Sequence, residues 1–285
     1  MNKVLLLFFL IAIGLLLAAC SKLESNIEPV SMLSIHKAGI NDASSMDFHG
    51  KLLKEKNYKM DECRQCHGGT FSGGYVEKSC LGCHSFPGGP EACNTCHGTF
   101  DDPMRSAPPK DLKDNVATDF KSVGAHTMHL YDNTLGNTVK CSNCHNVPIK
   151  VNDEGHIDNS TGAEVILKGL SVNNIAFNAQ YDQATGICSN SYCHGNFEFY
   201  RDSAVVENRF AYTTEKMVGL KKSVLWTKVD RSEVQCGSCH GLPPEGHISV
   251  PQNSCYMCHQ GVIDSDGKII DISKHINGIA NARGN

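Results

Sequence analysis

The chain has 285 residues and a formal net charge of −4, which excludes the strongly basic composition that is typical of nucleic-acid-binding proteins. It contains one Trp, an aromatic share of only 7%, 26 Gly and 10 Pro, so its own side chains cannot form a large apolar core. Fifteen cysteines and fourteen histidines are its unusual feature. We therefore expect a loop-rich chain that folds around something other than aliphatic side chains.

The N-terminal segment has the layout of an export signal. Met1–Lys3 is a short positive region, and Val4–Ala19 is an uncharged apolar run too short for a membrane span. The run ends in Leu17-Ala18-Ala19-Cys20, the cleavage pattern of bacterial lipoproteins. An ordinary signal peptide with a cysteine at the cleavage point is the alternative.

Cys20 is the one cysteine outside the motifs described below, so it is available for lipidation. We expect residues 1–19 to be a lipoprotein signal peptide and residues 20–35 a lipidated tether that anchors the protein to a membrane. Ser21, rather than Asp, follows the cysteine, which resembles the signal for sorting to the outer membrane of Gram-negative bacteria. The expected location is the outer membrane, on its cell-surface or periplasmic face.

Six copies of Cys-x-x-Cys-His and one stretched copy use the other fourteen cysteines. In this motif the two thiols bond covalently to a haem and the histidine ligates its iron, which is the attachment signature of c-type haem. The six regular copies are Cys63, Cys66 and His67; Cys80, Cys83 and His84; Cys93, Cys96 and His97; Cys141, Cys144 and His145; Cys236, Cys239 and His240; and Cys255, Cys258 and His259. The stretched copy has four residues between its thiols and consists of Cys188, Cys193 and His194. The sequence predicts seven covalently bound c-type haems.

Paired cysteines have other uses, namely zinc sites, iron–sulfur sites and disulfides. None of these explains why a histidine follows the second cysteine every time. For the stretched copy, a local disulfide between Cys188 and Cys193 is the alternative, because the longer spacer must bulge to bring both thiols to one porphyrin.

Seven histidines lie outside the motifs, which matches the one axial position that each of seven haems has left. They are the candidate distal ligands His36, His49, His126, His129, His156, His247 and His275. We expect five or more of them to bind iron; the alternative is that two or three of them are ordinary surface histidines. The methionines are the other possible sixth ligands, but they show no regular relation to the motifs. Ligation by two histidines favours lower reduction potentials than ligation by Met and His.

The spacing of the motifs divides the chain into two blocks. We predict a trihaem block at residues 36–105, a linker at 106–122 that includes Pro108 and Pro109, and a tetrahaem block at 123–285. His36 and His49 are expected to serve the first block, with one of His126 or His129 reaching back as its third ligand.

His126 and His129 lie three residues apart, so on a helix they share a face. They could ligate two different haems and fix their relative placement. The alternative is that only one of them ligates.

The expected fold is that of a multihaem cytochrome c, mostly irregular coil with short α-helices at the haem motifs, little β structure and a core formed by the haems. Residues 163–167 and 174–181 are the best strand candidates, and residues 182–186 are the predicted turn. We expect them to form a hairpin over the fourth or fifth haem.

Residues 123–280 resemble the CxxxxCH…CxxCH domain of outer-membrane lipoprotein multihaem c-type cytochromes from metal-reducing bacteria. The matching elements are Gly124-Ala125-His126-x-x-His129-Leu130, Cys141-x-x-Cys144-His145-x-Val147-Pro148, Gly155-His156, Cys188-x4-Cys193-His194-Gly195, Leu225-Trp226, Cys236-Gly237-x-Cys239-His240-Gly241-x-Pro243-Pro244, His247, Cys255-x-x-Cys258-His259 and His275-x-Asn277-Gly278. The resemblance implies electron transfer across or outside the outer membrane, and a haem at the stretched motif.

The expected function is therefore that of an electron carrier and not an enzyme. Its expected partners are other multihaem cytochromes, an outer-membrane porin, terminal acceptors such as ferric oxides, and the membrane itself through the lipid on Cys20. The alternative is a multihaem reductase of a small nitrogen or sulfur oxyanion, which needs one iron with an open face. A five-coordinate, high-spin haem would distinguish the reductase from the carrier.

Overall fold

The computed structural model describes residues 35–100, 110–158, 162–173 and 178–283. The chain divides into two compact units, residues 1–59 and 60–285. The predicted signal peptide, Cys20 and most of the tether lie outside the described residues, as do 101–109 and 174–177. The predicted division into a trihaem block, a linker and a tetrahaem block stays a prediction. Within the described ranges, no helix combines the length and apolar character that a membrane span requires.

The first unit is described from residue 35 to residue 59 and contains one helix, α2 (His49–Glu55). His49 begins this helix, and its backbone and ring are both tied to one carbonyl. Its backbone N–H and its Nδ1 atom donate to the carbonyl oxygen of Ile40 at 2.9 and 2.8 Å. The side chain of this candidate ligand is therefore held in one orientation.

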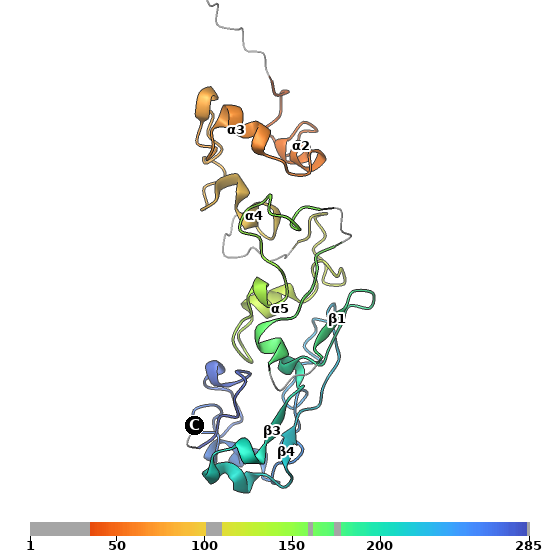
Figure 1. Ribbon diagram of the computed structural model, residues 1–285, viewed down its shortest axis with the longest axis vertical. Helices are drawn as coiled ribbons and strands as arrows, with labels where there is room; N and C mark the ends of the chain where they lie inside the picture. Colours follow the sequence, from red (N-terminus) through yellow and green to blue (C-terminus); the bar gives the residue numbers. More distant parts are fainter. Residues whose placement is uncertain (1–34, 101–109, 159–161, 174–177, 284–285) are drawn as a thin grey trace, which may run out of the picture. The chain divides into compact units, whose positions relative to one another are not determined.

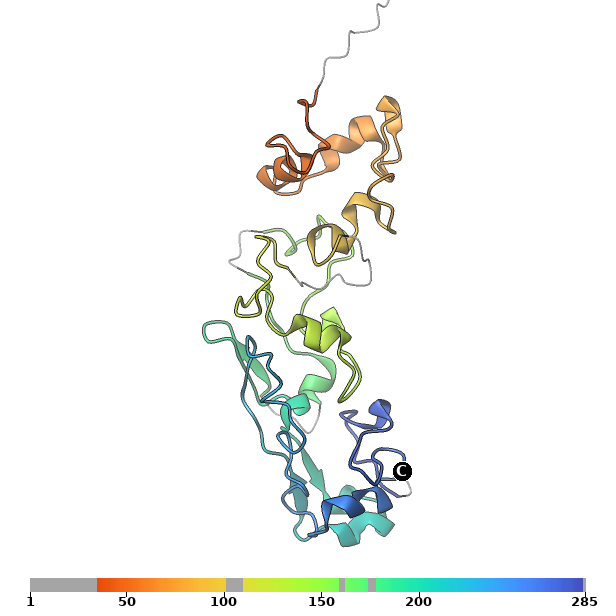
Figure 2. The same cartoon turned by 180° about the vertical axis from the view of Figure 1, so that it is seen from behind.

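The second unit is built from short helices separated by irregular chain (Figures 1 and 2). Its α-helices are α3 (Asp61–His67), α4 (Cys93–Cys96) and α5 (His126–Tyr131). Its 3₁₀ helices are η1 (Gly74–Val76), η2 (Gly89–Glu91), η3 (Cys141–Asn143), η4 (Gly169–Val172), η5 (Tyr192–His194), η6 (Arg201–Ser203), η7 (Val206–Ala211), η8 (Gln252–Met257) and η9 (Ile272–Lys274). The expectation of mostly coil with short helices is confirmed.

Short α-helices were expected at the haem motifs, but only the first and third motifs have one; the fourth, fifth and seventh have 3₁₀ helices, and the second and sixth have neither. Residues 80–84 and 236–240 form turns and bends. What most motifs share is one hydrogen bond, from the N–H of the histidine to the carbonyl of the first cysteine four residues earlier. It joins His84 to Cys80, His97 to Cys93, His145 to Cys141 and His259 to Cys255 at 2.9–3.0 Å. A single turn is enough to bring the histidine back beside the cysteines, so a longer helix is not needed.

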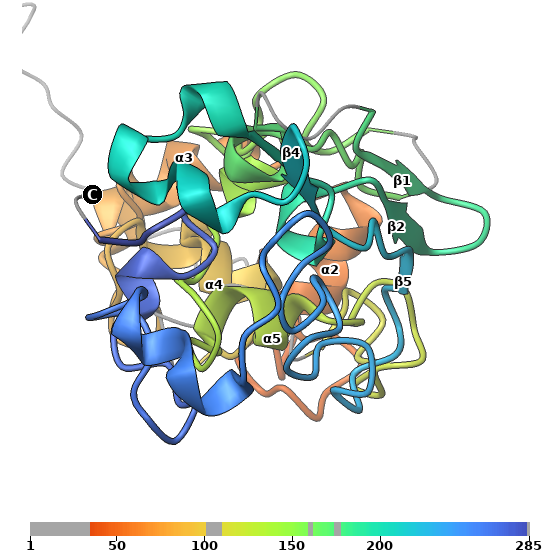
Figure 3. The same ribbon diagram turned by 90° about the horizontal axis from the view of Figure 1, so that it is seen from below.

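Two small antiparallel sheets complete the second unit. Strands β1 (Gln180–Asp182), β2 (Ile187–Ser189) and β5 (Val224–Leu225) form a three-stranded sheet in the order β1-β2-β5, and Figure 3 shows them side by side. Strands β3 (Glu198–Tyr200) and β4 (Lys216–Val218) form the other sheet. In the first sheet, Cys188 on the central strand faces Tyr181 and Val224 in the register. The sheet thus fixes the first cysteine of the stretched motif.

The predicted turn of the hairpin is present between β1 and β2, but the first predicted strand is wrong. Residues 163–168 are irregular. Their backbone groups are used by the fourth motif: Ile166 N–H donates to the carbonyl of Cys144 and the ring of His145 to the carbonyl of Glu164, both at 2.7 Å. The apolar run that suggested a strand instead holds a haem motif.

The apolar core of the described chain is small. Its buried hydrophobic residues are Met60, Phe71, Val123, Ala125, Tyr192, Met217 and Val224. This agrees with the composition, which does not supply a large side-chain core.

Glu198 provides the main charged link between β3 and β4. Its carboxylate accepts from Lys216 Nζ at 2.8 Å and lies 3.4 Å from Lys221 Nζ. The hydroxyl of Tyr200 also donates to it at 2.8 Å. The hydrogen bond from Lys216 is the largest cause that lowers the pKa of Glu198, to about 2.

We predict that the Glu198 ion pairs give the protein part of its stability against acid. Because the folded pKa is lowered from 4.5 to about 2, the contribution is present above pH 4.5 and is lost as the pH falls through 2. Glu198→Gln should lower the free energy of unfolding at pH 7 by about 1 kcal/mol or less, since the pair is near the surface. Denaturant titrations from pH 7 to pH 2 should give a difference between variant and wild type that shrinks below pH 4.5; a difference that grows there would contradict the prediction.

Candidate haem-binding sites

Five of the seven motif histidines face a candidate distal histidine. The ring centres of these pairs are 6.1–6.5 Å apart. The pairs are His97 with His156, His145 with His126, His194 with His129, His240 with His275, and His259 with His247. Each pair thus joins one motif histidine to one histidine from outside the motifs.

This separation fits one iron between two imidazoles. With metal–nitrogen bonds of about 2 Å, as for imidazole ligands in general, two rings that bind opposite sides of one metal have their centres about 6 Å apart. Rings in direct van der Waals contact would lie closer. The spacing therefore leaves room for an iron and the thickness of a porphyrin.

The ring nitrogens of these histidines also point to metal binding. The Nδ1 atoms of His126, His129, His156 and His247 lie 2.7–2.9 Å from backbone carbonyl oxygens, and His275 contacts the carbonyl of Leu135 in the same way. A carbonyl oxygen only accepts, so Nδ1 carries the proton. Nε2 then has the free lone pair, which is the arrangement that orients a histidine for a metal.

Four of the motif histidines are fixed in a similar way. Nδ1 of His67, His145, His240 and His259 contacts the carbonyls of Lys78, Glu164, Gly241 and Asn281 at 2.5–2.9 Å. Each of these four rings is therefore oriented by the surrounding backbone.

Burial keeps several of these imidazoles neutral. It lowers the pKa of His126 and of His194 to about 4, and it also lowers the pKa of His97 and His275. At neutral pH these rings are uncharged, which is the form that ligates iron.

The stretched motif borders a cavity that is open to solvent. Cys188, His194 and the facing His129 line it. Its other lining residues are mostly apolar, and the charged side chains among them are Lys228, Arg231 and Glu233. A largely apolar wall with a cysteine and two facing imidazoles suits a macrocycle that binds iron, so the residues at this motif fit a haem.

The fourteen motif cysteines all lie in the described part of the chain, and none of them forms a disulfide there. At the stretched motif, burial raises the pKa of Cys188 and Cys193 to about 11. The local disulfide considered for this motif is absent from the described residues.

The backbones of the fifth and sixth motifs approach each other closely and are bridged by a third segment. The segment after β4 donates to both: Leu220 N–H to the carbonyl of Cys239 at 2.9 Å, and Lys221 N–H to that of Gly195 at 3.0 Å. Gly195 has a φ of +92°, and a Cβ there would lie 2.0 Å from the carbonyl oxygen of Cys239. Glycine is required here both by the left-handed backbone and by the close approach.

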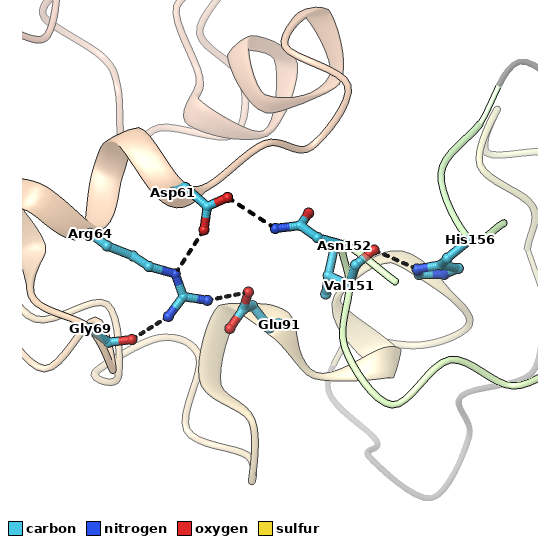
Figure 4. A network of polar contacts seen from close by, with 7 residues as sticks. All are labelled: Asp61, Arg64, Gly69, Glu91, Val151, Asn152 and His156. Atoms are coloured by element: carbon cyan, nitrogen blue, oxygen red, sulfur yellow. Dashed lines mark hydrogen bonds and ion pairs between the residues drawn. The ribbon is translucent and has the colours of Figure 1, made fainter. Parts of the chain in front are cut away.

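A polar network ties the first motif to the third (Figure 4). Arg64, inside the first motif, pairs with Glu91 at 2.5 Å and with Asp61 at 3.5 Å, and it also donates to the carbonyl of Gly69. Glu91 ends η2, two residues before Cys93. The network thus holds the two motifs at a fixed separation.

The same network reaches the loop that carries His156. Asn152 donates to Asp61 at 3.3 Å, and the neighbouring carbonyl of Val151 accepts from the ring of His156 (Figure 4). The candidate distal ligand of the third motif is therefore positioned from the first motif. Surface ion pairs of this kind add about 1 kcal/mol or less to stability, so their role is placement.

One expected pairing is wrong. His126 and His129 do not reach back to the third motif, because His156 lies opposite His97. They face the fourth and fifth motifs instead, so the expectation that one helix serves two haems matches the geometry. The assignment of His36 and His49 to the motifs of His67 and His84 stays a prediction.

Sequence reasoning gave no role to Arg64, Gly195 or Trp226. Trp226 contacts two candidate ligands and lines the cavity of the stretched motif. Trp226 is the only Trp of the sequence, and this rarity is the one feature that pointed to it in advance. The role of Arg64 depends on partners distant in sequence, and no local pattern marks it.

Two features define a multihaem c-type cytochrome with covalently bound haem. One is a set of cysteine pairs, each followed by a histidine, and the other is a second histidine that faces each of these. More particularly, residues 187–240 match a family model described as the Geobacter CxxxxCH...CXXCH motif, which confirms the resemblance for this segment. The segment runs from β2, through the stretched motif, to the histidine of the sixth motif. No curated protein and no solved structure matches the chain.

We predict that Gly195→Ala disrupts the junction of the fifth and sixth motifs. The added Cβ would meet the carbonyl of Cys239 at 2.0 Å on a backbone with positive φ. The free energy of unfolding should fall by about 1–3 kcal/mol. Denaturant unfolding followed by circular dichroism measures it, with Gly69→Ala as the control because a Cβ at Gly69 meets nothing within 4 Å. Equal effects of the two substitutions would contradict the prediction.

Proposed function

We propose that the protein is a heptahaem c-type cytochrome that carries electrons and has two histidines on every iron. The observation that carries this proposal is the set of five histidine pairs with ring centres 6.1–6.5 Å apart. A chain that provides a ligand for both sides of each iron leaves no open coordination position for a substrate. The same rule extended to the first two motifs assigns His36 and His49 as the remaining distal ligands.

The bound haems supply one-electron chemistry, and the chain supplies their placement. The cysteines hold each ring covalently, and the paired histidines favour low reduction potentials. Backbone carbonyls at the Nδ1 atoms increase the basicity of the ligands and fix the ring planes. Short links, such as the junction between Gly195 and Cys239, hold neighbouring sites together for electron transfer.

We further propose that the protein is a lipoprotein of the outer membrane, anchored through Cys20, that takes part in extracellular electron transfer. The lipoprotein cleavage pattern supports the anchor, and the resemblance to cytochromes of metal-reducing bacteria supports the role. Other multihaem cytochromes, an outer-membrane porin and ferric oxides are its proposed partners. The net charge of −4 gives no reason to expect nucleic acid among them.

The intact mass and the EPR spectrum of the oxidised protein test the proposal together. We expect a mass that corresponds to seven haems and to a lipid on Cys20, and EPR signals from low-spin iron only. Six haems would mean that the stretched motif is empty and would break the match of seven spare histidines to seven haems. A high-spin signal from about one haem would favour a reductase.

We predict that His247→Ala converts one haem to the high-spin state. His247 faces His259 at 6.5 Å, and its loss opens one side of a single iron. The mass should still show all seven haems, because the covalent bonds are formed by the cysteines. His247→Met is the matched variant: it restores a sixth ligand, so the iron should return to low spin with a raised potential. A spectrum that stays wholly low-spin in His247→Ala would show that His247 is not a ligand.

A further inference from the structure

Trp226 lies against both candidate distal histidines of α5. Its ring centre is 4.8 Å from that of His126 and 5.4 Å from that of His129. The indole is perpendicular to the first imidazole, at 89°, and inclined by 30° to the second. One side chain therefore touches the ligands of two successive haem motifs.

The chain fixes the position of this indole from several sides. Its Nε1–H donates to the carbonyl of Lys121 and its backbone N–H to that of Gly186, both at 2.8 Å. At Gly124 a Cβ would lie 2.0 Å from Nε1, so the backbone at the start of α5 can approach the ring only as glycine. The indole is held in one orientation and has little room to turn.

The two imidazole pairs beside Trp226 differ in their plane angles. His126 and His145 are nearly parallel, with an interplanar angle of 26°, whereas His129 and His194 are inclined by 62°. Both distal rings come from one short helix, but Nδ1 of His126 bonds to the carbonyl of Val123 and Nδ1 of His129 to that of Ala125. The indole touches both rings, so it is placed to hold each of them in its own orientation.

We propose that Trp226 is a positioning residue that sets the imidazole planes of the fourth and fifth haem sites and thereby their electronic structures. The proposal rests on the proposed function, since it takes His126 and His129 to be iron ligands. A flat ring packed edge-on against one imidazole resists its rotation, and the same ring inclined over the other limits a second rotation. Trp226 thus links the geometry of two neighbouring irons.

EPR spectroscopy tests the proposal directly. Near-parallel imidazole planes give low-spin iron a rhombic signal, and strongly inclined planes give it a more anisotropic one. Trp226→Leu should leave seven haems by mass and only low-spin iron, while two of the seven low-spin signals shift. Trp226→Phe retains an aromatic ring but not the bond to Lys121, and it should shift the same two signals less.

Phe71→Leu is the matched control. Phe71 is buried, but its ring lies against the guanidinium of Arg64, 4.7 Å from the ring centre, and not against an imidazole. This variant should lose stability without shifting the two signals that Trp226→Leu shifts. If it shifts the signals as Trp226→Leu does, the effect is a general loss of packing and the proposal is wrong.

Gly124→Ala tests the same idea without removing the indole, because its Cβ displaces the ring. It should shift the same two low-spin EPR signals as Trp226→Leu. The proposal can therefore still be tested if the leucine variant fails to fold. Unchanged signals in both Gly124→Ala and Trp226→Phe would overturn the role of Trp226. High-spin iron in the wild type would instead count against the proposed function, so the two failures are distinguishable.

Discussion

The structure depends on one constraint, which is that two imidazoles must face each other about 6 Å apart with their Nε2 lone pairs directed inward. Five pairs have this ring separation, and in each pair the Nδ1 atom of the distal ring is held by a backbone carbonyl, which leaves Nε2 for a metal. The secondary structure serves this purpose and little else: single turns hold the motifs, and short strands hold Cys188. Under the proposed ligation, each iron would cross-link two distant parts of the chain, so that haem binding and folding are coupled. The small number of buried apolar side chains is then sufficient.

Neighbouring sites are connected by shared elements. Helix α5 carries candidate distal histidines for the fourth and fifth motifs, and the segment after β4 bonds to the backbones at the fifth and sixth. The C-terminal part is attached to the middle of the chain as well, because the ring of His275 contacts the carbonyl of Leu135, 140 residues earlier. These connections make the position of one haem depend on that of the next. Such dependence suits an electron carrier, whose rate is set by distances between cofactors.

The sequence predicts those features of the sites that are formed by residues close together in the chain. A motif histidine and its cysteines lie within a few residues, so their chemistry follows from spacing alone. The spacing of His126 and His129 on one helix face likewise foretold that they could serve two haems. The partner of His97 could not be predicted, because His156 is brought there by a loop held through Asn152, Asp61 and Arg64. The strand expected at residues 163–167 failed for a related reason: apolar alternation does not reveal that a distant motif uses the carbonyl of Glu164.

The choice between a carrier and an enzyme comes down to what the chain does with each spare histidine. A reductase would keep one distal position free and would place an acid or a cation beside it. Here, each motif histidine from the third motif to the seventh has an imidazole opposite it, so a small oxyanion would have to displace a ligand fixed through its Nδ1 atom. Electrons can still enter and leave through the haem edges, because transfer between edges needs no bond to iron. On this reasoning the selectivity of the protein would lie in the surfaces that bring partners near those edges, and a lipid anchor would act by limiting which surfaces meet.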